Sequence, residues 1–364
     1  MYIILKMHNT VTTLAIIFSL IITIGIITPA HVFADTDTAS EPEDLSGRVI
    51  FLDPGHDEET GNYIEDYSEH ITMLILAEKI KPRLEELGAT VYLTRDSEKR
   101  KSSEVRCAFI NQCALKAIKE ARLHDAEADD DDAADVGEID RLIAVLQTII
   151  DEPKLGEVYM NSPYDPERTI HPDQARVLKL EDDDEILSRF LFVSLHSNAS
   201  SYGGNSGDSG ACAFYISTTD KIVKNYYENI PYSSYSEISR DFGNIILDHI
   251  AGTGLINLGS MADNFFMIRE HNIPGVLVEN GYHTNPGDRA MLQSDEFLET
   301  LAEAYADAIV EYFRDILLPE RFSEPEEILV EEPEEEEQVE ETDDSDAVAE
   351  EETYEIKRVF LYIS

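Results

Sequence analysis

Apolar residues recur along the chain with two different spacings, which predict strands and helices in alternation. Continuous apolar runs bounded by polar or turn residues predict five strands, at residues 48–52, 90–94, 190–195, 211–217 and 275–278. Apolar positions three and four residues apart predict helices at about 69–87, 103–122, 139–150, 234–252 and 295–317. Residues 151–180 are rich in proline and aspartate, and they predict a loop.

This order of elements predicts an α/β fold. Strands that alternate with helices over most of a chain usually build one sheet that the helices cover. We therefore expect a mostly parallel or mixed twisted sheet with helices on both faces, in a single domain over residues 47–320.

The first 34 residues have the pattern of an export leader. Lys6 precedes an apolar run at 11–27, and Val32 and Ala34 occupy the −3 and −1 positions of a cleavage site. This pattern predicts a signal peptide at 1–34. The alternative is an uncleaved membrane anchor, because the apolar run approaches the length that spans a bilayer. Under both interpretations the rest of the chain is exported, to the periplasm, the cell wall or the medium.

Negative charge is concentrated in three runs. The chain has 75 Asp+Glu against 28 Lys+Arg and a formal net charge of −47. Residues 125–140, 181–185 and 323–353 contain nine, five and seventeen acids, respectively. Such a charge argues against nucleic acid and anionic lipid as partners. Because like charges repel, we expect a disordered acidic tail at 321–353. The polar composition of residues 35–46 predicts a linker, and the less acidic residues 354–364 form a short segment after the tail.

Polar residues with catalytic potential follow three of the predicted strands. His56, His196 and Glu279 come directly after apolar runs, and Glu69 opens the first predicted helix. Ligands of open α/β sheets bind at the carboxyl ends of strands, so these side chains are expected to converge. Two histidines and a carboxylate are a ligand set for catalytic zinc, and a further carboxylate can serve as general base. The three cysteines have no metal-site spacing and make no disulfide framework.

Six segments in the same order resemble the zinc-dependent N-acetylmuramoyl-L-alanine amidases of the amidase 3 family. They are the strand at 49–56, Glu69 with its helix, the V-x-x-T-R strand at 91–95, Arg106 with Asn111, the S-x-H-x-N segment at 193–199, and 276–285. The resemblance implies that His56, Glu69 and His196 bind Zn²⁺ and that Glu279 is the general base. It also implies hydrolysis of the amide between N-acetylmuramic acid and the L-alanine of peptidoglycan stem peptides.

The chain departs from the family pattern at several positions. The usual glycine pair after the first histidine is replaced by the acidic segment 57–59, and Met73 replaces an asparagine. Glu65 and His70 are neighbouring alternatives to Glu69 as ligand. The remaining histidines near the site, His271 and His283, are expected to have surface or core roles.

The largest departure is an acidic insertion at about 112–186. Two interpretations stay open: it gates access to the cleft, where a protein regulator could act, or it is a peripheral elaboration. Two alternatives to the amidase also stay open. A zinc peptidase or carboxypeptidase would need a basic residue for a terminal carboxylate, and Arg269 and Arg289 are the nearby candidates. A catalytically silent wall-binding or regulatory protein would be expected to have lost a ligand or the base.

Overall fold

The computed structural model describes residues 44–60, 63–64, 66–125, 131–160, 170–201, 207–217 and 233–316. The expected leader, most of the linker, the acidic tail and the final segment lie outside these residues. None of the described helices combines the length and the apolar character that a membrane span needs.

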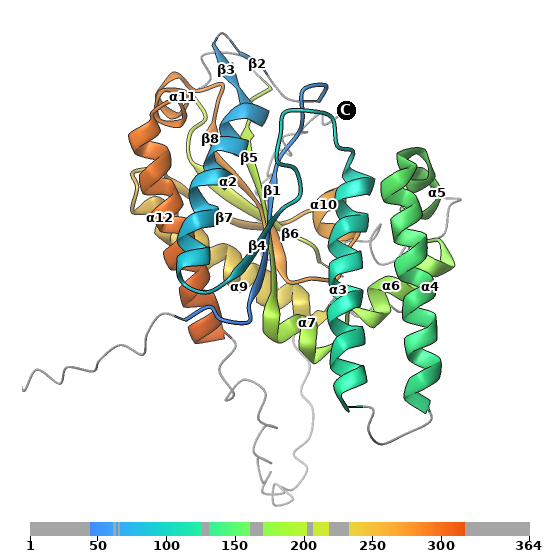
Figure 1. The fold of residues 1–364 in the computed structure, drawn as a ribbon. Helices are drawn as coiled ribbons and strands as arrows, with labels where there is room; N and C mark the ends of the chain where they lie inside the picture. Colours follow the sequence, from blue (N-terminus) through green and yellow to red (C-terminus); the bar gives the residue numbers. More distant parts are fainter. Residues whose placement is uncertain are drawn as a thin grey trace, which may run out of the picture. The chain divides into compact units, whose positions relative to one another are not determined.

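A six-stranded sheet forms the centre of the fold (Figure 1). Its strands lie in the order β4-β1-β5-β8-β6-β7. Neighbouring strands are parallel except β6 and β8, which are antiparallel, so the expectation of a mostly parallel or mixed sheet is confirmed. The strands are β1 (Val49–Pro54), β4 (Thr90–Leu93), β5 (Phe190–Asn198), β6 (Ala211–Tyr215), β7 (Asn257–Ala262) and β8 (Gly275–Tyr282). A separate hairpin joins β2 (Tyr63–Ile64) to β3 (Tyr67–Ser68).

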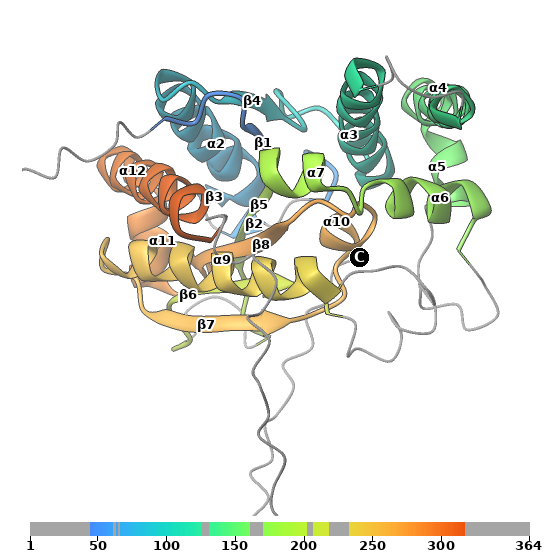
Figure 2. The same ribbon diagram turned by 90° about the horizontal axis from the view of Figure 1, so that it is seen from below.

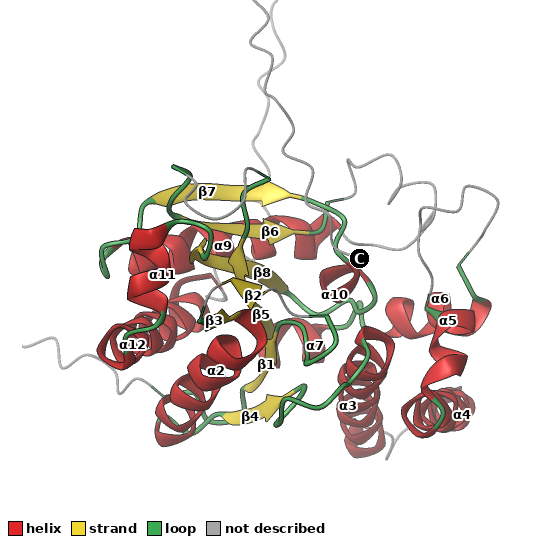
Figure 3. Ribbon diagram, turned by 90° about the horizontal axis from the view of Figure 1, so that it is seen from above, coloured by secondary structure: helices red, strands yellow, loops and turns green. Residues whose placement is uncertain are grey.

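Helices cover both faces of the sheet (Figures 2 and 3). One face packs against α2 (Glu69–Glu86), α9 (Ser233–Ala251) and α12 (Asp295–Glu311), and the other against α3 (Ser103–Asp125). Helix α4 (Asp131–Asp151) packs against α3 on the side away from the sheet. The side chains of β1 show how the two cores separate, because successive strand residues point to opposite faces. Ile50 and Leu52 belong to the first core and Phe51 to the second, and all three are fully buried.

The prediction of a loop over residues 151–180 is wrong for the part of it that the structure describes. Here the chain forms η1 (Pro153–Leu155), α5 (Gly156–Tyr159) and α6 (Pro172–Leu180), and α7 (Asp184–Arg189) follows. Proline at the first position of α6 and a hydrogen bond from the Asp173 N–H to His171 Nδ1 start that helix. The remaining short elements are α10 (Phe266–Arg269), α11 (Pro286–Leu292) and η2 (Tyr312–Ile316).

The acidic insertion contributes to the core. The buried face of α4 packs against α3 and belongs to the same apolar cluster as Phe51 of β1. Its members on α4 are Ile139, Leu142, Leu146 and Ile149. Farther along, Gln174 of α6 donates a hydrogen bond to the Glu270 carbonyl at 3.0 Å. The insertion is therefore bonded to the residue that follows α10.

One buried carboxyl of the insertion predicts a pH-dependent stability. Glu181 is fully buried, and burial raises its pKa to about 8, although the Asn272 N–H donates to it. Between about pH 5 and pH 8 the folded chain keeps a proton that the unfolded chain releases. The free energy of unfolding should therefore fall as pH rises, by at most about 1.4 kcal/mol per pH unit.

Glu181→Gln should remove this dependence, because the amide stays neutral. Denaturant unfolding at pH 6 and pH 8 should show a smaller loss of stability in the variant than in the native chain. Glu120→Gln, on the exposed side of α3, is the control and should keep the native difference. An equal loss in Glu181→Gln and the native chain would contradict the assignment.

Candidate metal centre

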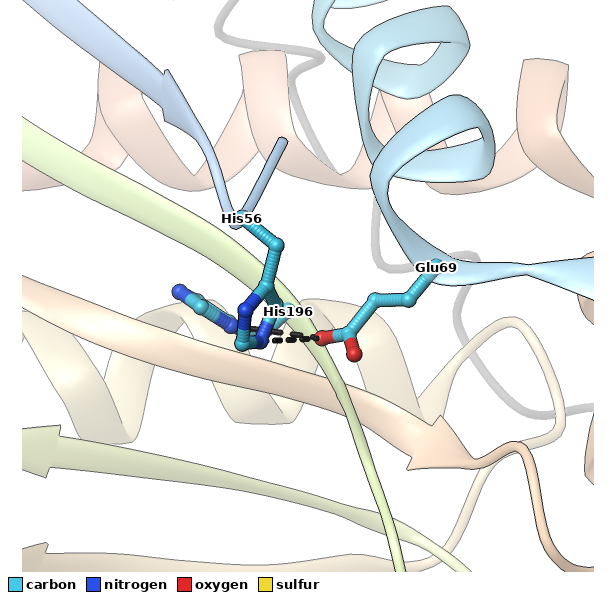
Figure 4. Close-up of side chains that lie close together, drawn as sticks. All are labelled: His56, Glu69 and His196. Atoms are coloured by element: carbon cyan, nitrogen blue, oxygen red, sulfur yellow. Dashed lines mark hydrogen bonds and ion pairs between the residues drawn. The ribbon is translucent and has the colours of Figure 1, made fainter. Parts of the chain in front are cut away.

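Three side chains from different elements converge at one end of the sheet (Figure 4). His56 follows β1, Glu69 is the first residue of α2, and His196 lies near the end of β5. One donor atom of each lies within 4.8 Å of the others. Glu69 Oε1 lies 3.4 Å from His56 Nε2 and 3.3 Å from His196 Nδ1. The structure thus brings together the three residues that the sequence singled out as a metal site, and we call them the candidate triad.

Gly55 allows the two histidine rings to approach each other. A Cβ atom at this position would lie 2.4–2.6 Å from three atoms of the His196 ring, closer than atoms can pack. The ring centroids of His56 and His196 are 4.8 Å apart. His56 itself has φ of +57°, in the left-handed region that few L-residues adopt. The backbone of the turn after β1 is therefore shaped so that it leaves space for the His196 ring.

Two buried arginines hold this turn through its carbonyl groups. Arg95 donates to the carbonyls of Pro54 at 2.9 Å and Gly55 at 3.0 Å. Arg106 donates to the carbonyl of Pro54 at 2.9 Å and to that of His56. Both arginines belong to segments that resemble the family pattern, and these contacts give a physical reason for their presence there. They fix the backbone that carries the first histidine.

Asp53, at the end of β1, anchors the same arrangement. Its carboxylate is fully buried, accepts a hydrogen bond from Ser194 at 2.7 Å and another from Thr94, and lies 3.2 Å from Arg106 Nη1. Burial alone would raise its pKa, but the Arg106 charge and the hydroxyl donors lower it below the ordinary value. The Asp53 carboxylate therefore connects β1 to β5, to α3 and to the residue that follows β4.

The electrostatics of the candidate triad favour an anionic carboxylate between two imidazoles. Burial opposes the charge of Glu69, but the two histidines hold its pKa well below the usual range. Burial likewise opposes protonation of His56, and the Glu69 charge outweighs it and raises the pKa. Burial lowers the pKa of His196. One anionic oxygen and two imidazole nitrogens fit the donor preference of zinc, and catalytic zinc sites take a water as fourth ligand beside three such donors.

Glu279 lies beside the candidate triad but is not part of it. It pairs in register with His196 on the neighbouring strand β8, and only 3% of it is exposed. Its Oε2 atom has no hydrogen-bond partner among the described residues. Burial, together with the nearby charge of Glu69, raises its pKa well above the ordinary value. A buried, unpartnered carboxyl next to a metal-ligand set has the character of a proton-transfer group.

A hydrogen-bonded group behind Glu69 was missed by the sequence reasoning. The Tyr67 hydroxyl donates to Ser197 Oγ at 2.7 Å, and that oxygen lies 3.0 Å from His283 Nδ1. The rings of Tyr67 and His283 are stacked with centroids 5.4 Å apart. The Ser197 N–H in turn donates to Glu69 Oε1 at 3.0 Å. His283, for which a surface or core role was expected, is buried, and its contacts support the orientation of Glu69.

The alternative ligands do not join the triad. His70 is buried, with Nδ1 3.0 Å from Ser68 Oγ and Nε2 3.8 Å from Glu98. His271 packs against the Phe192 ring, with centroids 4.4 Å apart. Glu65 lies outside the described residues.

Comparisons with known proteins place this site in context. A family model described as N-acetylmuramoyl-L-alanine amidase matches residues 50–123 and 166–311, more than half of the chain. The probable cell wall amidase LytH of Staphylococcus epidermidis is 36% identical over 59 residues, 16% of this chain and 20% of that protein. The endolysin of Bacillus phage SPP1 is 29% identical over 121 residues, 33% of this chain and 39% of that protein.

Among solved structures, the catalytic domain of CwlV, an N-acetylmuramoyl-L-alanine amidase from Bacillus (Paenibacillus) polymyxa var. colistinus, aligns with a TM-score of 0.42. It has 20% identity, and the alignment covers 73% of this chain and 98% of that domain. The chain spans about a fifth of the length of the LytH relative and about two fifths of that of the endolysin.

Proposed function

The chain belongs to the N-acetylmuramoyl-L-alanine amidase family, and from this membership we propose that it is an exported, zinc-dependent hydrolase of peptidoglycan. The bond cleaved is the amide between N-acetylmuramic acid and the L-alanine of the stem peptide. The leader expected at 1–34 supports this function, because peptidoglycan lies outside the cytoplasmic membrane. Export places the protein in the periplasm, the cell wall or the medium, or on the membrane if the leader is not cleaved.

The observation that carries the proposal is the convergence of the candidate triad beside an unpartnered Glu279. His56, Glu69 and His196 would hold the zinc ion. When bound, zinc supplies a Lewis acid that lowers the pKa of water and polarises the scissile carbonyl.

Residues of the chain transfer the proton and hold the metal ligands in position. Glu279 accepts a proton from the attacking water and passes it to the leaving amine of L-alanine. The Ser197 N–H holds Glu69 in place through the 3.0 Å hydrogen bond to its carboxylate. Arg95 and Arg106 keep the turn that carries His56 rigid.

The geometry gives less support to the peptidase alternative. Both arginines that could have held a terminal carboxylate are already engaged. Arg269 is 2% exposed, donates to the Asn264 side chain at 2.7 Å and lies 3.1 Å from a Glu270 oxygen. Arg289 donates to the His283 carbonyl at 2.8 Å. The silent-protein alternative is disfavoured because the ligand set and Glu279 are intact.

Digestion of peptidoglycan tests the proposal. Purified protein should release stem peptides that begin with L-alanine, identified by mass, and a zinc chelator should abolish the release. Zinc added back in slight excess should restore it, since the donor set is that of a zinc site. Shortened stems with the lactyl amide intact would instead indicate the peptidase. Binding without products would indicate the silent protein.

The insertion offers a route by which a protein regulator could reach the site. Its helix α6 is bonded through Gln174 to Glu270, directly after α10. We therefore propose that a partner bound to the insertion would alter the rate of peptidoglycan hydrolysis through α10. Gln174→Ala should weaken that response and leave the binding of the partner unchanged.

A further inference from the structure

A pocket of about 270 Å³ opens beside the candidate triad. Its lining combines His56 and His196 with an aromatic stretch at Phe265 and Phe266 and a polar segment at residues 100–104. That polar segment leads into and begins the 23-residue helix α3. The volume lies just below the roughly 300–1,000 Å³ of small-molecule sites. The pocket therefore suits a small part of a substrate rather than a glycan chain.

Two of the three acidic side chains that line this pocket, Asp53 and Asp57, are already engaged. Asp53 is paired with Arg106, and Asp57 accepts a hydrogen bond from the backbone N–H of Lys101 at 3.2 Å. The stem of Glu104 packs against α5, where a side chain on the facing glycine would overlap it. Asp53 and Asp57 thus shape the wall, and Glu104 adds a half-buried carboxylate to it.

Lys101 is the cation of the wall that has no carboxylate partner among the described residues. Its ammonium group lies over the Phe109 ring, 5.5 Å from the centroid, and its side chain is half-buried. Arg100, in contrast, forms an ion pair with Glu59. The adjacent Ser102 Oγ is buried and has no hydrogen-bond partner in the described part of the chain. The wall therefore presents, next to each other, an ammonium group that has no ion pair among the described residues and a hydroxyl group that has no hydrogen-bond partner there.

The position of Lys101 is fixed relative to the candidate triad. Arg106 Nε donates to the Lys101 carbonyl at 2.7 Å, and the same guanidinium donates to the His56 carbonyl. The rigid, planar guanidinium group of Arg106 thus connects the backbone of Lys101 with that of His56. The carboxylate of Asp57, the residue after His56, connects the two segments a second time.

We propose that this pocket is a subsite for a carboxylate of the stem peptide, with Lys101 as its counter-charge and Ser102 as a hydroxyl donor. The proposal rests on the amidase function and adds a substrate feature to it. A chain with a net charge of −47 repels anionic substrates at long range, so a local cation is needed to seat one.

Two soluble muramoyl peptides test the subsite. They differ only in whether the residue after L-alanine carries a carboxylate or the isosteric carboxamide. The zinc-loaded full chain should have a KM about 10-fold lower for the carboxylate, the size expected for a charge-assisted hydrogen bond. In Lys101→Met this ratio should fall to about 1, and in Lys101→Arg it should be largely retained. Lys99→Met, at an exposed position outside the lining, should keep the native ratio.

Each outcome has a distinct meaning. A native chain that hydrolyses both peptides with equal KM would overturn the subsite and leave the amidase function intact. So would a Lys101→Met variant that keeps the native ratio. Absence of lactyl-amide cleavage in both peptides would overturn the amidase function itself. Cleavage within the stem would identify a peptidase that uses the same cation. The readout is the ratio of the KM values of two substrates for the same variant. A misfolded fraction of the protein affects both measurements equally and leaves this ratio unchanged.

Discussion

Glu279→Gln should lower the rate of amide hydrolysis about 100- to 10,000-fold, the usual contribution of a positioned general base. The amide has the size of the carboxyl group but cannot accept the proton of the attacking water. Because the replacement has the same size at this buried position, it should not destabilise the fold. Zinc binding should also persist, since Glu279 lies outside the candidate triad.

The measurement is the rate of L-alanine end release from peptidoglycan at equal zinc occupancy. Occupancy is checked by metal analysis and the fold by thermal unfolding. Glu237→Gln, an exposed change of the same kind on α9, should retain the native rate. A Glu279→Gln variant with full activity would refute the assignment of this residue as the base.

Gly55→Ala should weaken zinc binding about 10- to 100-fold, as changes next to metal ligands typically do. The new methyl group would overlap the His196 ring, which must then move out of line with His56 and Glu69. The backbone itself can accept the change, because the φ angle of Gly55 is not in the left-handed region. We therefore expect a folded protein whose metal site is displaced.

Competition between the protein and a chromophoric zinc chelator would measure this affinity. Gly137→Ala is a matched control, because a Cβ at that position on α4 meets no atom within 4 Å. It should leave the affinity unchanged. If Gly55→Ala bound zinc as tightly as the native chain, the His196 ring would not be the group that the glycine accommodates.

The three strands that lead to the candidate site were predicted because burial on both faces sets their pattern. The apolar runs before His56, His196 and Glu279 are interior strands of the sheet, so they lack alternating polar residues. Strand β7 escaped prediction because it is an edge strand with mostly exposed residues. Helix α6 escaped because its proline, which reads as a loop signal, occupies the first helical position.

The candidate site also has a part that the sequence could predict and a part that it could not. The carboxyl ends of neighbouring strands coincide by the geometry of a parallel sheet, so convergence of His56 and His196 could be expected from their positions. Contacts among Tyr67, Ser197 and His283 could not, because they join three distant segments through packing that leaves no local periodicity. The pocket wall at residues 100–104 was missed for the same reason.

The left-handed conformation of His56 has a consequence for metal exchange. Such a backbone costs an L-residue about 1–2 kcal/mol, and here hydrogen bonds from Arg95 and Arg106 to the carbonyls around it maintain it. The shape of the turn is thus imposed by the protein and not by the ion. One metal should replace another without a slow rearrangement of the chain, so the exchange rate should be governed by departure of the bound ion.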